Sequence, residues 1–231
     1  MEFNSHTNLK LKCTNNCIIT PYSTFLLECI ENENFEGKKI CDFGCGTGVL
    51  GLNIRAKYNC NITGLDIINE AIQLSKENAK FNLLDNCHFC TVDDFISNPY
   101  YKPYSFKFDY IISNPASIPS NSLSVKNPFI NGGINGNQMI NNMIDLANSY
   151  LKKKGQVIFL HTSLASLHNT LLMLDKYGYK ISIEKVKQLE FRKQYNDYIE
   201  YLELLKNQNE NFFFDNNGKK FELIYLIRII K

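Results

Sequence analysis

The sequence lacks several features that would assign it to a specialised class of protein. It has no apolar run of the roughly 18 residues that a membrane-spanning helix needs, and residues 1–12 are polar, without the apolar core of a signal peptide. Charge of one sign is not in excess, since 25 basic against 23 acidic residues give a net charge of +2. We therefore expect a cytoplasmic protein without a membrane partner. Nucleic acid is disfavoured, although a local basic patch stays open.

Cysteine is absent after residue 90. The eight cysteines are Cys13, Cys17, Cys29, Cys41, Cys45, Cys60, Cys87 and Cys90. Without a secretion signal, free thiols are expected. Cys87 and Cys90 have the C-x-x-C spacing of zinc sites, and Cys13 and Cys17 could complete a tetrad. Because free cysteine is common in protein cores, we expect no metal.

The length and composition suit one packed domain. The chain has 231 residues, of which 44% are hydrophobic and 13% aromatic, so disorder of the whole chain is excluded. We expect a leading segment over 1–38 with a helix at 22–30, and a domain over 39–231. An insertion at about 191–220 is expected to hold a helix over 194–206 and a polar loop over 207–217.

From residue 39 onward, strand-like and helix-like segments alternate. The expected strands are 39–43, 61–67, 88–92, 108–113, 156–161, 180–188 and 221–230, and the expected helices are 49–58, 69–82, 138–151 and 164–177. This alternation predicts an α/β fold with a mostly parallel sheet covered on both faces. The last two strands lack a full crossover helix between them, which predicts an antiparallel pair at the sheet edge.

Three finer expectations concern which side chains are buried. Ala71, Ile72, Leu74 and Ala79 should form the apolar stripe of the 69–82 helix. Ile181, Ile183 and Val186 should face inward from the 180–188 strand. The lysines at 152–154 should be a solvated helix end, where cations are favourable.

Polar residues and glycines gather where the expected strands end. The segment 41–48, Cys-Asp-Phe-Gly-Cys-Gly-Thr-Gly, follows a strand and opens a helix, so its backbone can turn tightly and approach a ligand. Asp66 follows about 20 residues later, where a carboxylate can accept both hydroxyls of a ribose. Asp93 and Asp94 end a third strand, and Asn114 ends a fourth. Since ligands bind at the carboxyl ends of parallel strands, this spacing predicts a nucleoside-containing cofactor.

These residues resemble the class I methyltransferases that use S-adenosylmethionine (SAM), over roughly residues 18 to 190. Asp42 to Gly48 looks like their first motif, Asp66 like their ribose-binding acid and Asp93 like their adenine-side acid. The resemblance implies a Rossmann-like, doubly wound, seven-stranded sheet with an antiparallel last strand, and SAM as cofactor. The candidate cofactor-binding residues are Asp42, Gly44, Gly46, Gly48, Asp66, Ile67, Asp93, Asp94, Asn114 and Thr24.

A narrower resemblance is to amino- and amide-N-methyltransferases. The segment 113–119, Ser-Asn-Pro-Ala-Ser-Ile-Pro, is similar to their Asn-Pro-Pro-Tyr loop. Segments 19–27 and 131–136 are similar to stretches of the enzymes that methylate the glutamine of peptide-chain release factors. The resemblance implies that Asn114 and the Pro115 carbonyl accept hydrogen bonds from the target nitrogen and are the catalytic residues. Ser117 stands where these enzymes have an aromatic residue, so a stacking platform is missing.

The functional prediction is a SAM-dependent methyltransferase, acting on a nitrogen of a small molecule or of a protein side chain, as a monomer or homodimer. Ser117, Tyr22 and Tyr195 are the candidate acceptor contacts. One alternative is an O-methyltransferase for a small acid or alcohol, with His161 or Arg192 assisting proton transfer. Another is a non-catalytic partner subunit of the same fold.

Overall fold

The computed structural model describes residues 3–4, 9–121 and 127–231. They form two compact units, and each is described by itself. The first unit comprises residues up to 114 with 147–158 and 231, and the second comprises 115–146 and 159–230. Two elements, α5 (Gln138–Tyr150) and β7 (Leu151–Thr162), each continue from one unit into the other.

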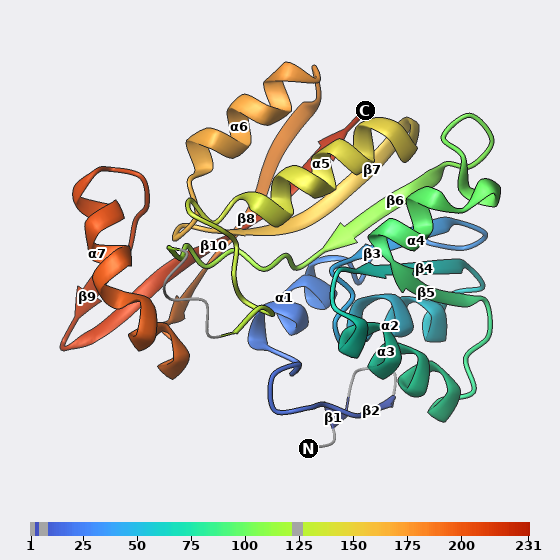
Figure 1. Ribbon diagram of the computed structural model, residues 1–231, viewed down its shortest axis with the longest axis horizontal. Helices are drawn as coiled ribbons and strands as arrows, with labels where there is room; N and C mark the ends of the chain where they lie inside the picture. The colour runs from blue at the N-terminus through green and yellow to red at the C-terminus, as the bar shows by residue number, and fades with distance from the viewer. Residues whose placement is uncertain (1–2, 5–8, 122–126) are drawn as a thin grey trace. The chain divides into compact units, whose positions relative to one another are not determined.

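The core of the first unit is a parallel sheet. Its strands are β3 (Lys39–Phe43), β4 (Asn61–Asp66), β5 (Cys87–Thr91), β6 (Phe108–Ser113) and the start of β7. The order is β5-β4-β3-β6-β7, with β3 parallel to both β4 and β6 (Figure 1). Four of the five β3 residues and five of the six β4 residues are buried. This continuous burial is typical of parallel strands covered on both faces.

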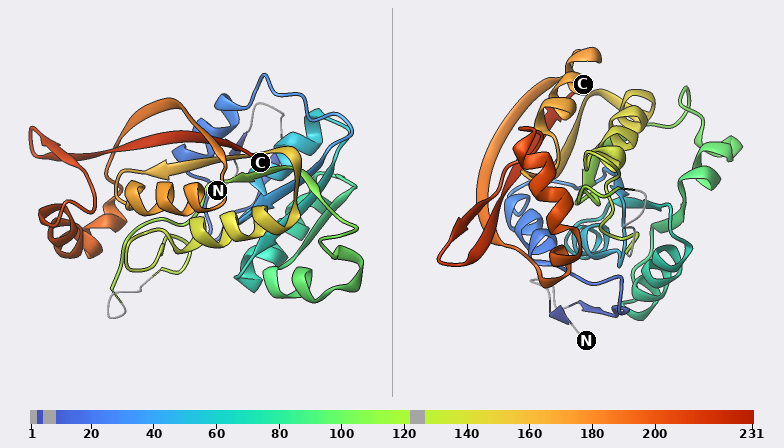
Figure 2. Two further views of the ribbon diagram at one scale, coloured as in Figure 1. Left: turned by 90° about the horizontal axis from the view of Figure 1, so that it is seen from above. Right: turned by 60° about the vertical axis from the view of Figure 1, so that its left-hand side comes forward.

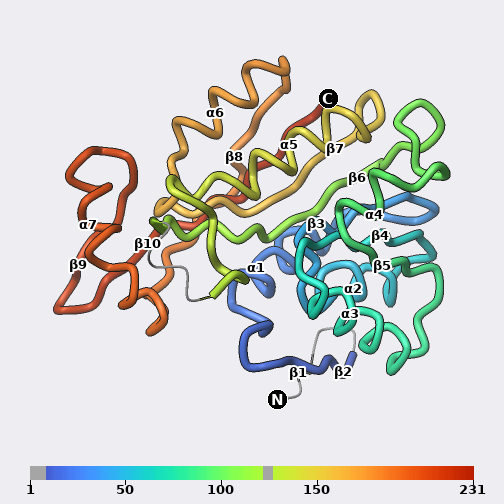
Figure 3. Tube along the Cα trace, in the orientation of Figure 1, coloured from blue at the N-terminus to red at the C-terminus, as the bar shows by residue number. Residues whose placement is uncertain are grey.

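The helices of the first unit connect these strands. They are α1 (Pro21–Cys29), α2 (Val49–Lys57), α3 (Asn69–Phe81), α4 (Val92–Ser97) and the 3-10 helix η1 (Pro99–Tyr101). The α2 helix contacts β3 and β4, and α3 contacts β4 and β5. The trace in Figure 3 follows this alternation of strand and helix from residue 39 onward. Proline at the first position of α1 and Thr20 as its N-cap fix where that helix begins.

The N-terminal segment is held by α3. The short strands β1 (Phe3–Asn4) and β2 (Lys10–Leu11) pair antiparallel. The side chain of Asn78 accepts from the Lys12 amide at 2.8 Å and donates to the Lys12 carbonyl at 3.1 Å. Asn82 makes the same pair of bonds with Lys10, at 3.0 and 2.9 Å. Two asparagines one helical turn apart therefore pair with the backbone of the leading segment as a neighbouring strand would.

The second unit is built on an antiparallel group of strands. Here β10 (Lys219–Ile230) pairs with β8 (Lys180–Glu190) and with β9 (Phe214–Asn216), and the end of β7 lies beside β10. A register shift between Leu226 and Ile227 marks a bulge. The α6 helix (Leu167–Lys176) precedes β8, while η2 (Lys193–Tyr198) and α7 (Ile199–Asn207) lead to β9. Figure 2 shows α7 beside the β9–β10 hairpin.

The predicted fold class is confirmed, since parallel strands are followed by antiparallel C-terminal strands. Several boundaries were wrong. The β7 strand begins at Leu151 rather than residue 156, so the lysines at 152–154 lie in a strand and not at a helix end. Their side chains are exposed, and an exposed strand end carries no apolar signal in the sequence. The helix expected from 164 begins at Leu167, after the Ser166 N-cap.

The inward face predicted for β8 was also wrong. Ile181, Ile183 and Val186 are 38%, 47% and 56% exposed. Alternation along a strand separates its two faces but does not say which of them is covered.

The loop expected over 207–217 contains β9. Its hairpin turn is Asn217-Gly218, with φ of 53° and 77°. This is the pair that two-residue hairpins favour, and that signal was missed.

Gly64 provides a test of the sheet packing. It lies opposite Phe89 in the β4–β5 pairing, and a Cβ atom there would lie 2.3 Å from the Phe89 ring. Because both positions are interior, Gly64→Ala should lower the free energy of unfolding by about 1–3 kcal/mol. Urea denaturation checks this value. Asn61→Ala, at the exposed start of the same strand, should change stability by less than about 0.5 kcal/mol. Equal stability of the two variants would contradict the packing.

Candidate functional site

A glycine loop joins β3 to α2. Gly44, Gly46 and Gly48 have φ of 72°, 53° and 79°, a region that other residues rarely adopt. The amides of Gly44 and Cys45 donate to the Leu65 carbonyl at 2.7 and 3.1 Å. The loop is therefore held against the end of β4, and its turn leads directly into the N-terminus of α2, where backbone N–H groups are unpaired.

Polar side chains of α3 hold the same loop. Ser75 Oγ donates to the Gly46 carbonyl at 2.8 Å, and Asn78 Nδ2 donates to the Thr47 carbonyl at 2.9 Å. Both side chains are fully buried. The apolar stripe of this helix is confirmed, because all four predicted members are buried, but Ser75 and Asn78 were missed. Both residues lie three or four positions after members of the apolar stripe, so the helical spacing alone could have predicted that they are buried.

Asp66 lies at the end of β4 and is only 6% exposed. Its Oδ2 accepts from the Gly46 amide and its Oδ1 from the Ile68 amide, each at 3.0 Å. Burial raises the pKa of Asp66, while these backbone N–H bonds oppose the rise. A carboxylate oxygen can accept more than one hydrogen bond, so acceptor capacity remains. The next residue, Ile67, is 61% exposed and places apolar surface beside the acid.

Asp42 lies within β3 and is 1% exposed. Its Oδ2 accepts from the Gly51 amide of α2 at 2.9 Å, whereas its Oδ1 has no hydrogen-bond partner among the described residues. Burial raises the pKa of Asp42 to about 7, and the nearby Asp66 raises it further against the Gly51 bond. A buried carboxylate oxygen without a partner is costly, so this atom is suited to a donor group of a ligand.

Asp93 and Asp94 lie in the first turn of α4, directly after β5, and both are exposed. The Thr91 hydroxyl caps the helix by accepting from the Asp94 amide at 3.1 Å. The two acids thus follow the carboxyl end of the strand next to β4.

Asn114 follows β6, and its Nδ2 donates to Ser23 Oγ at 3.1 Å. Ser23 lies in α1 and is buried, so the bond joins residues 91 positions apart. The preceding Ser113 hydroxyl donates to the Phe43 carbonyl at 2.7 Å, which ties the end of β6 to the start of the glycine loop. Thr24, also in α1, donates to the Thr20 carbonyl at 3.5 Å, and Tyr22 is 8% exposed.

In the second unit, the loop after Pro115 packs on two glycines. A Cβ at Gly132 would lie 2.6 Å from Ser117 Cα, and one at Gly136 would lie 2.5 Å from the Ser117 carbonyl oxygen. Residues 118 and 131 form a parallel bridge, with the Gly132 amide donating to the Ile118 carbonyl at 2.9 Å. These glycines are therefore required by close backbone contact, and Ser117 is half-buried between them.

Two further candidates of the second unit are buried. Tyr195 is 2% exposed and belongs to a hydrophobic cluster, where its ring lies 5.5 Å from that of Phe191. His161 is fully buried, with Nε2 3.0 Å from Thr170 Oγ1, and burial lowers its pKa to about 4. A contact of Tyr195 with an acceptor stays a prediction.

The cysteines are free thiols. Burial raises the pKa of Cys17 to about 12, and that of Cys87 to about 12, so neither is a thiolate at neutral pH. Within residues 3–4, 9–121 and 127–231, no group of three or more His, Cys, Asp or Glu side chains could hold a metal ion.

The first unit thus brings two buried acids, a left-handed glycine loop and a fixed asparagine to the carboxyl ends of neighbouring parallel strands. The sequence profile of the methyltransferase small domain matches residues 19–190. The chain belongs to the methyltransferase small domain family. It is a SAM-dependent methyltransferase. The orphaned Asp42 oxygen, the remaining acceptor capacity of Asp66 and the exposed Ile67 fit such a cofactor, which carries amine and hydroxyl donors and an adenine ring.

Several known proteins are similar in sequence. A protein of Methanocaldococcus jannaschii, named as an N5-glutamine methyltransferase, is 29% identical over 160 residues, which span 68% of this chain and 78% of that protein. A release factor glutamine methyltransferase of Aliivibrio fischeri is 36% identical over 87 residues, 36% of this chain and 28% of that protein. A ribosomal protein L11 methyltransferase of Shewanella woodyi is 31% identical over 45% of this chain and 33% of that protein.

Solved structures show the same fold at low identity. The YcgJ protein of Bacillus subtilis aligns with a TM-score of 0.63 at 14% identity, over 89% of this chain and 97% of that one. The E. cuniculi Mtq2–Trm112 complex, which is described as responsible for methylation of the eRF1 translation termination factor, aligns with a TM-score of 0.58 at 18% identity, over 93% of this chain and 97% of that one. Among the described helices, none is both long enough and apolar enough to span a bilayer.

The raised pKa of Asp42 predicts a pH-dependent stability. An acid whose folded-state pKa lies above its unfolded value contributes stability that is complete below the unfolded pKa and is lost as pH rises through the folded one. Between about pH 4 and 7, the wild type should therefore lose about 1.4 kcal/mol per pH unit relative to Asp42→Asn. Urea unfolding of both proteins at pH 4.5, 5.5 and 6.5 measures this. A stability difference independent of pH would contradict it.

Proposed function

We propose that the protein transfers a methyl group to a side-chain nitrogen of a protein acceptor. The observation that carries this proposal is the fixed asparagine at the end of β6. Because Nδ2 of Asn114 donates to Ser23, its Oδ1 is left to accept a hydrogen bond from an incoming N–H group. The similarity to a protein named as an N5-glutamine methyltransferase over 68% of the chain supports an amide nitrogen as the target.

The cofactor would be held by the first unit. When bound, SAM supplies an electrophilic methyl group on a sulfonium sulfur, so the protein needs no covalent chemistry of its own. Asp66 would accept hydrogen bonds from the ribose hydroxyls, and Ile67 would cover the adenine ring. Asp93 or Asp94 would accept a hydrogen bond from the polar edge of the adenine. The glycine loop, through Gly44, Gly46 and Gly48, would allow close approach of the backbone, and Asp42 would accept a donor through its orphaned oxygen. Thr24 would border the same site.

The acceptor would be oriented by Asn114 and Pro115. Two acceptor oxygens, the Asn114 side chain and the Pro115 carbonyl, would hold the N–H groups and aim the nitrogen lone pair at the methyl group. The new N–C bond would replace the S–C bond of the cofactor, and the nitrogen would lose its proton to solvent late in the reaction, so that no dedicated base is needed. Ser117 has no aromatic ring to stack on the acceptor, so we propose that Tyr22 supplies contact instead. A cytoplasmic location and a monomeric or homodimeric state belong to the same proposal.

The cofactor site is tested by calorimetric titration with S-adenosylhomocysteine. Asp66→Ala should weaken binding at least about tenfold, because it removes an acceptor for ligand hydroxyls. It also removes the bonds to Gly46 and Ile68, so Asp66→Asn, which keeps one acceptor oxygen, serves as the conservative variant and should lose less. If the folded wild type bound no S-adenosylhomocysteine, these residue roles would be wrong.

The acceptor site is tested by turnover on glutamine-containing peptides. Asn114→Ala should reduce kcat by about 10²-fold, since misplaced reactants lose that order of rate, and should leave S-adenosylhomocysteine affinity unchanged. Ser23→Ala, which frees the Asn114 amide, should cause a smaller loss. Asn59→Ala, at an exposed position beyond α2, is the control and should retain full turnover. Full activity of Asn114→Ala would contradict the proposed transfer to an amide nitrogen.

A further inference from the structure

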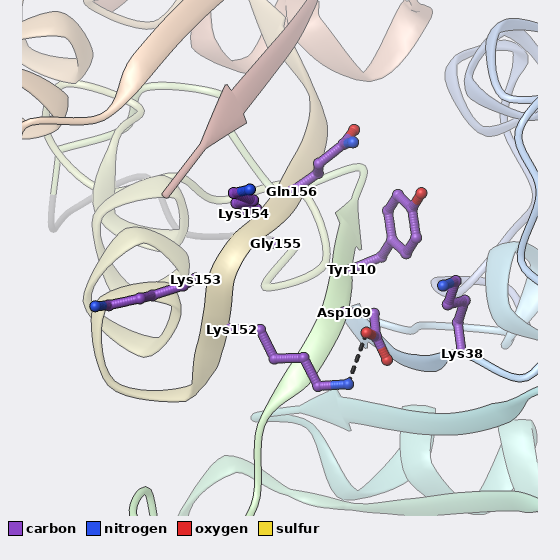
Figure 4. A pocket seen from close by; sticks show the side chains of 8 residues that line it. All are labelled: Lys38, Asp109, Tyr110, Lys152, Lys153, Lys154, Gly155 and Gln156. Atoms are coloured by element: carbon purple, nitrogen blue, oxygen red, sulfur yellow. Dashed lines mark hydrogen bonds and ion pairs between the residues drawn. The ribbon is translucent and has the colours of Figure 1, made fainter.

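A second notable surface of the first unit lies at the amino ends of its strands. A pocket of about 120 Å³ lies there, lined by residues at the starts of β3, β6 and β7. Its lining residues are Lys38, Asp109, Tyr110, Lys152, Lys153, Lys154, Gly155 and Gln156 (Figure 4). The glycine loop follows the carboxyl end of β3, so this pocket lies at the opposite edge of the same sheet. We call the four lining lysines the lysine edge.

The lysine edge carries an uncompensated positive charge. The one acid in the pocket, Asp109, is already engaged, because its Oδ1 pairs with Lys152 Nζ at 2.7 Å and its Oδ2 accepts from the Lys39 amide at 2.9 Å. Figure 4 shows this ion pair, with Lys38 on the other side of Asp109. Lys153 and Lys154 have no ion-pair partner among the described residues.

Two more lysines of the same unit enlarge the charge. Lys39 begins β3, and Lys107 precedes β6. Glu36, two residues before Lys38, accepts from the Asn59 amide at 3.0 Å.

The backbone is strained where it presents the lysines. Lys154 has φ of 62°, a conformation that side chains other than glycine adopt only at a cost. Gly155 follows, where a Cβ would lie 2.8 Å from Leu151 Cγ. Backbone strain at Lys154 and repulsion among the neighbouring lysines both lower the stability of the fold. An anionic ligand would offset the repulsion.

Exposed aromatic rings precede β6. Tyr100 of η1 and Tyr104 of the loop that follows are 84% and 88% exposed. The same loop contacts the residue next to Lys38, because the Phe106 ring lies 4.9 Å from Lys39 Nζ. Lysines that track a phosphate backbone, together with free aromatic faces on which bases stack, are typical of surfaces that bind single strands.

We propose that the lysine edge, together with Tyr100 and Tyr104, binds a single-stranded nucleic acid. A phosphate would lie against Lys38 and Lys154, in a pocket with room for several water molecules. Lys153, which Figure 4 shows directed away from Asp109, would contact the next phosphate along the strand. Because this edge is opposite the glycine loop, the bound strand would leave the methyl-transfer site open. Binding of the strand therefore does not depend on the proposed acceptor chemistry.

The test is fluorescence anisotropy with labelled 15-residue oligouridylate and oligothymidylate, at salt concentrations from 50 to 200 mM. The triple variant Lys38→Gln/Lys153→Gln/Lys154→Gln should bind at least about tenfold more weakly at low salt, and its slope of log affinity against log salt should fall by about two. The control Lys180→Gln/Lys185→Gln/Lys187→Gln removes the same charge from β8 and should bind as the wild type does. Both variants should keep wild-type affinity for S-adenosylhomocysteine, which separates this test from that of the proposed function.

A second variant tests the aromatic contribution. Tyr100→Ala/Tyr104→Ala should weaken binding of both oligonucleotides without changing the salt slope, because stacking releases no counterions. Failure of the wild type to bind either oligonucleotide would overturn the proposal. Equal weakening in the β8 control would also overturn it, as would displacement of the oligonucleotides by polyglutamate at equal charge, which would identify an acidic protein as the occupant.

Discussion

The bond between the Gly46 amide and the Asp66 carboxylate is the constraint on which the candidate site depends. It connects the loop after β3 with the end of β4, 20 residues away, at 3.0 Å. Because Gly44, Gly46 and Gly48 are left-handed, the conformation of the loop at these positions has no support from side chains of their own. It is supported by backbone bonds to Leu65 and by Ser75 and Asn78 of α3. Sheet, loop and helix therefore fix one another.

The same support explains why two carboxylates can be buried beside each other. Asp66 accepts hydrogen bonds from two backbone amides, and Asp42 accepts one from an amide of α2. These oriented N–H groups partly compensate the cost of burying each carboxylate. The compensation is incomplete, since Asp42 retains one oxygen without a partner and its pKa is raised to about 7. A site whose acceptor oxygens still lack partners gains more binding free energy from a cofactor with many hydrogen-bond donors than a site whose acceptors are all paired.

The two edges of the parallel sheet have different chemistry. The carboxyl edge carries acids, glycines and an asparagine, while the amino edge carries the lysines. Parallel strands make such a division possible, because all carboxyl ends lie along one edge and all amino ends along the other. The net charge of the whole chain, which is only +2, conceals this difference between the two edges. The two proposed ligands would therefore lie at opposite edges of one sheet and would not compete.

The sequence by itself determined the α/β class, the order of helices and strands, the glycine loop and the acids that follow the strands. These features depend on local periodicity, turn residues and spacing along the chain, which are readable without coordinates. Only the tertiary structure decided that Asn114 bonds Ser23 across 91 positions, that Ser75 and Asn78 hold the loop, and that Ile181, Ile183 and Val186 face solvent. It also brought Lys38 beside Lys152 to Lys154. Contacts between distant segments, and the choice of which strand face is covered, follow from packing and leave no periodic signal in the sequence.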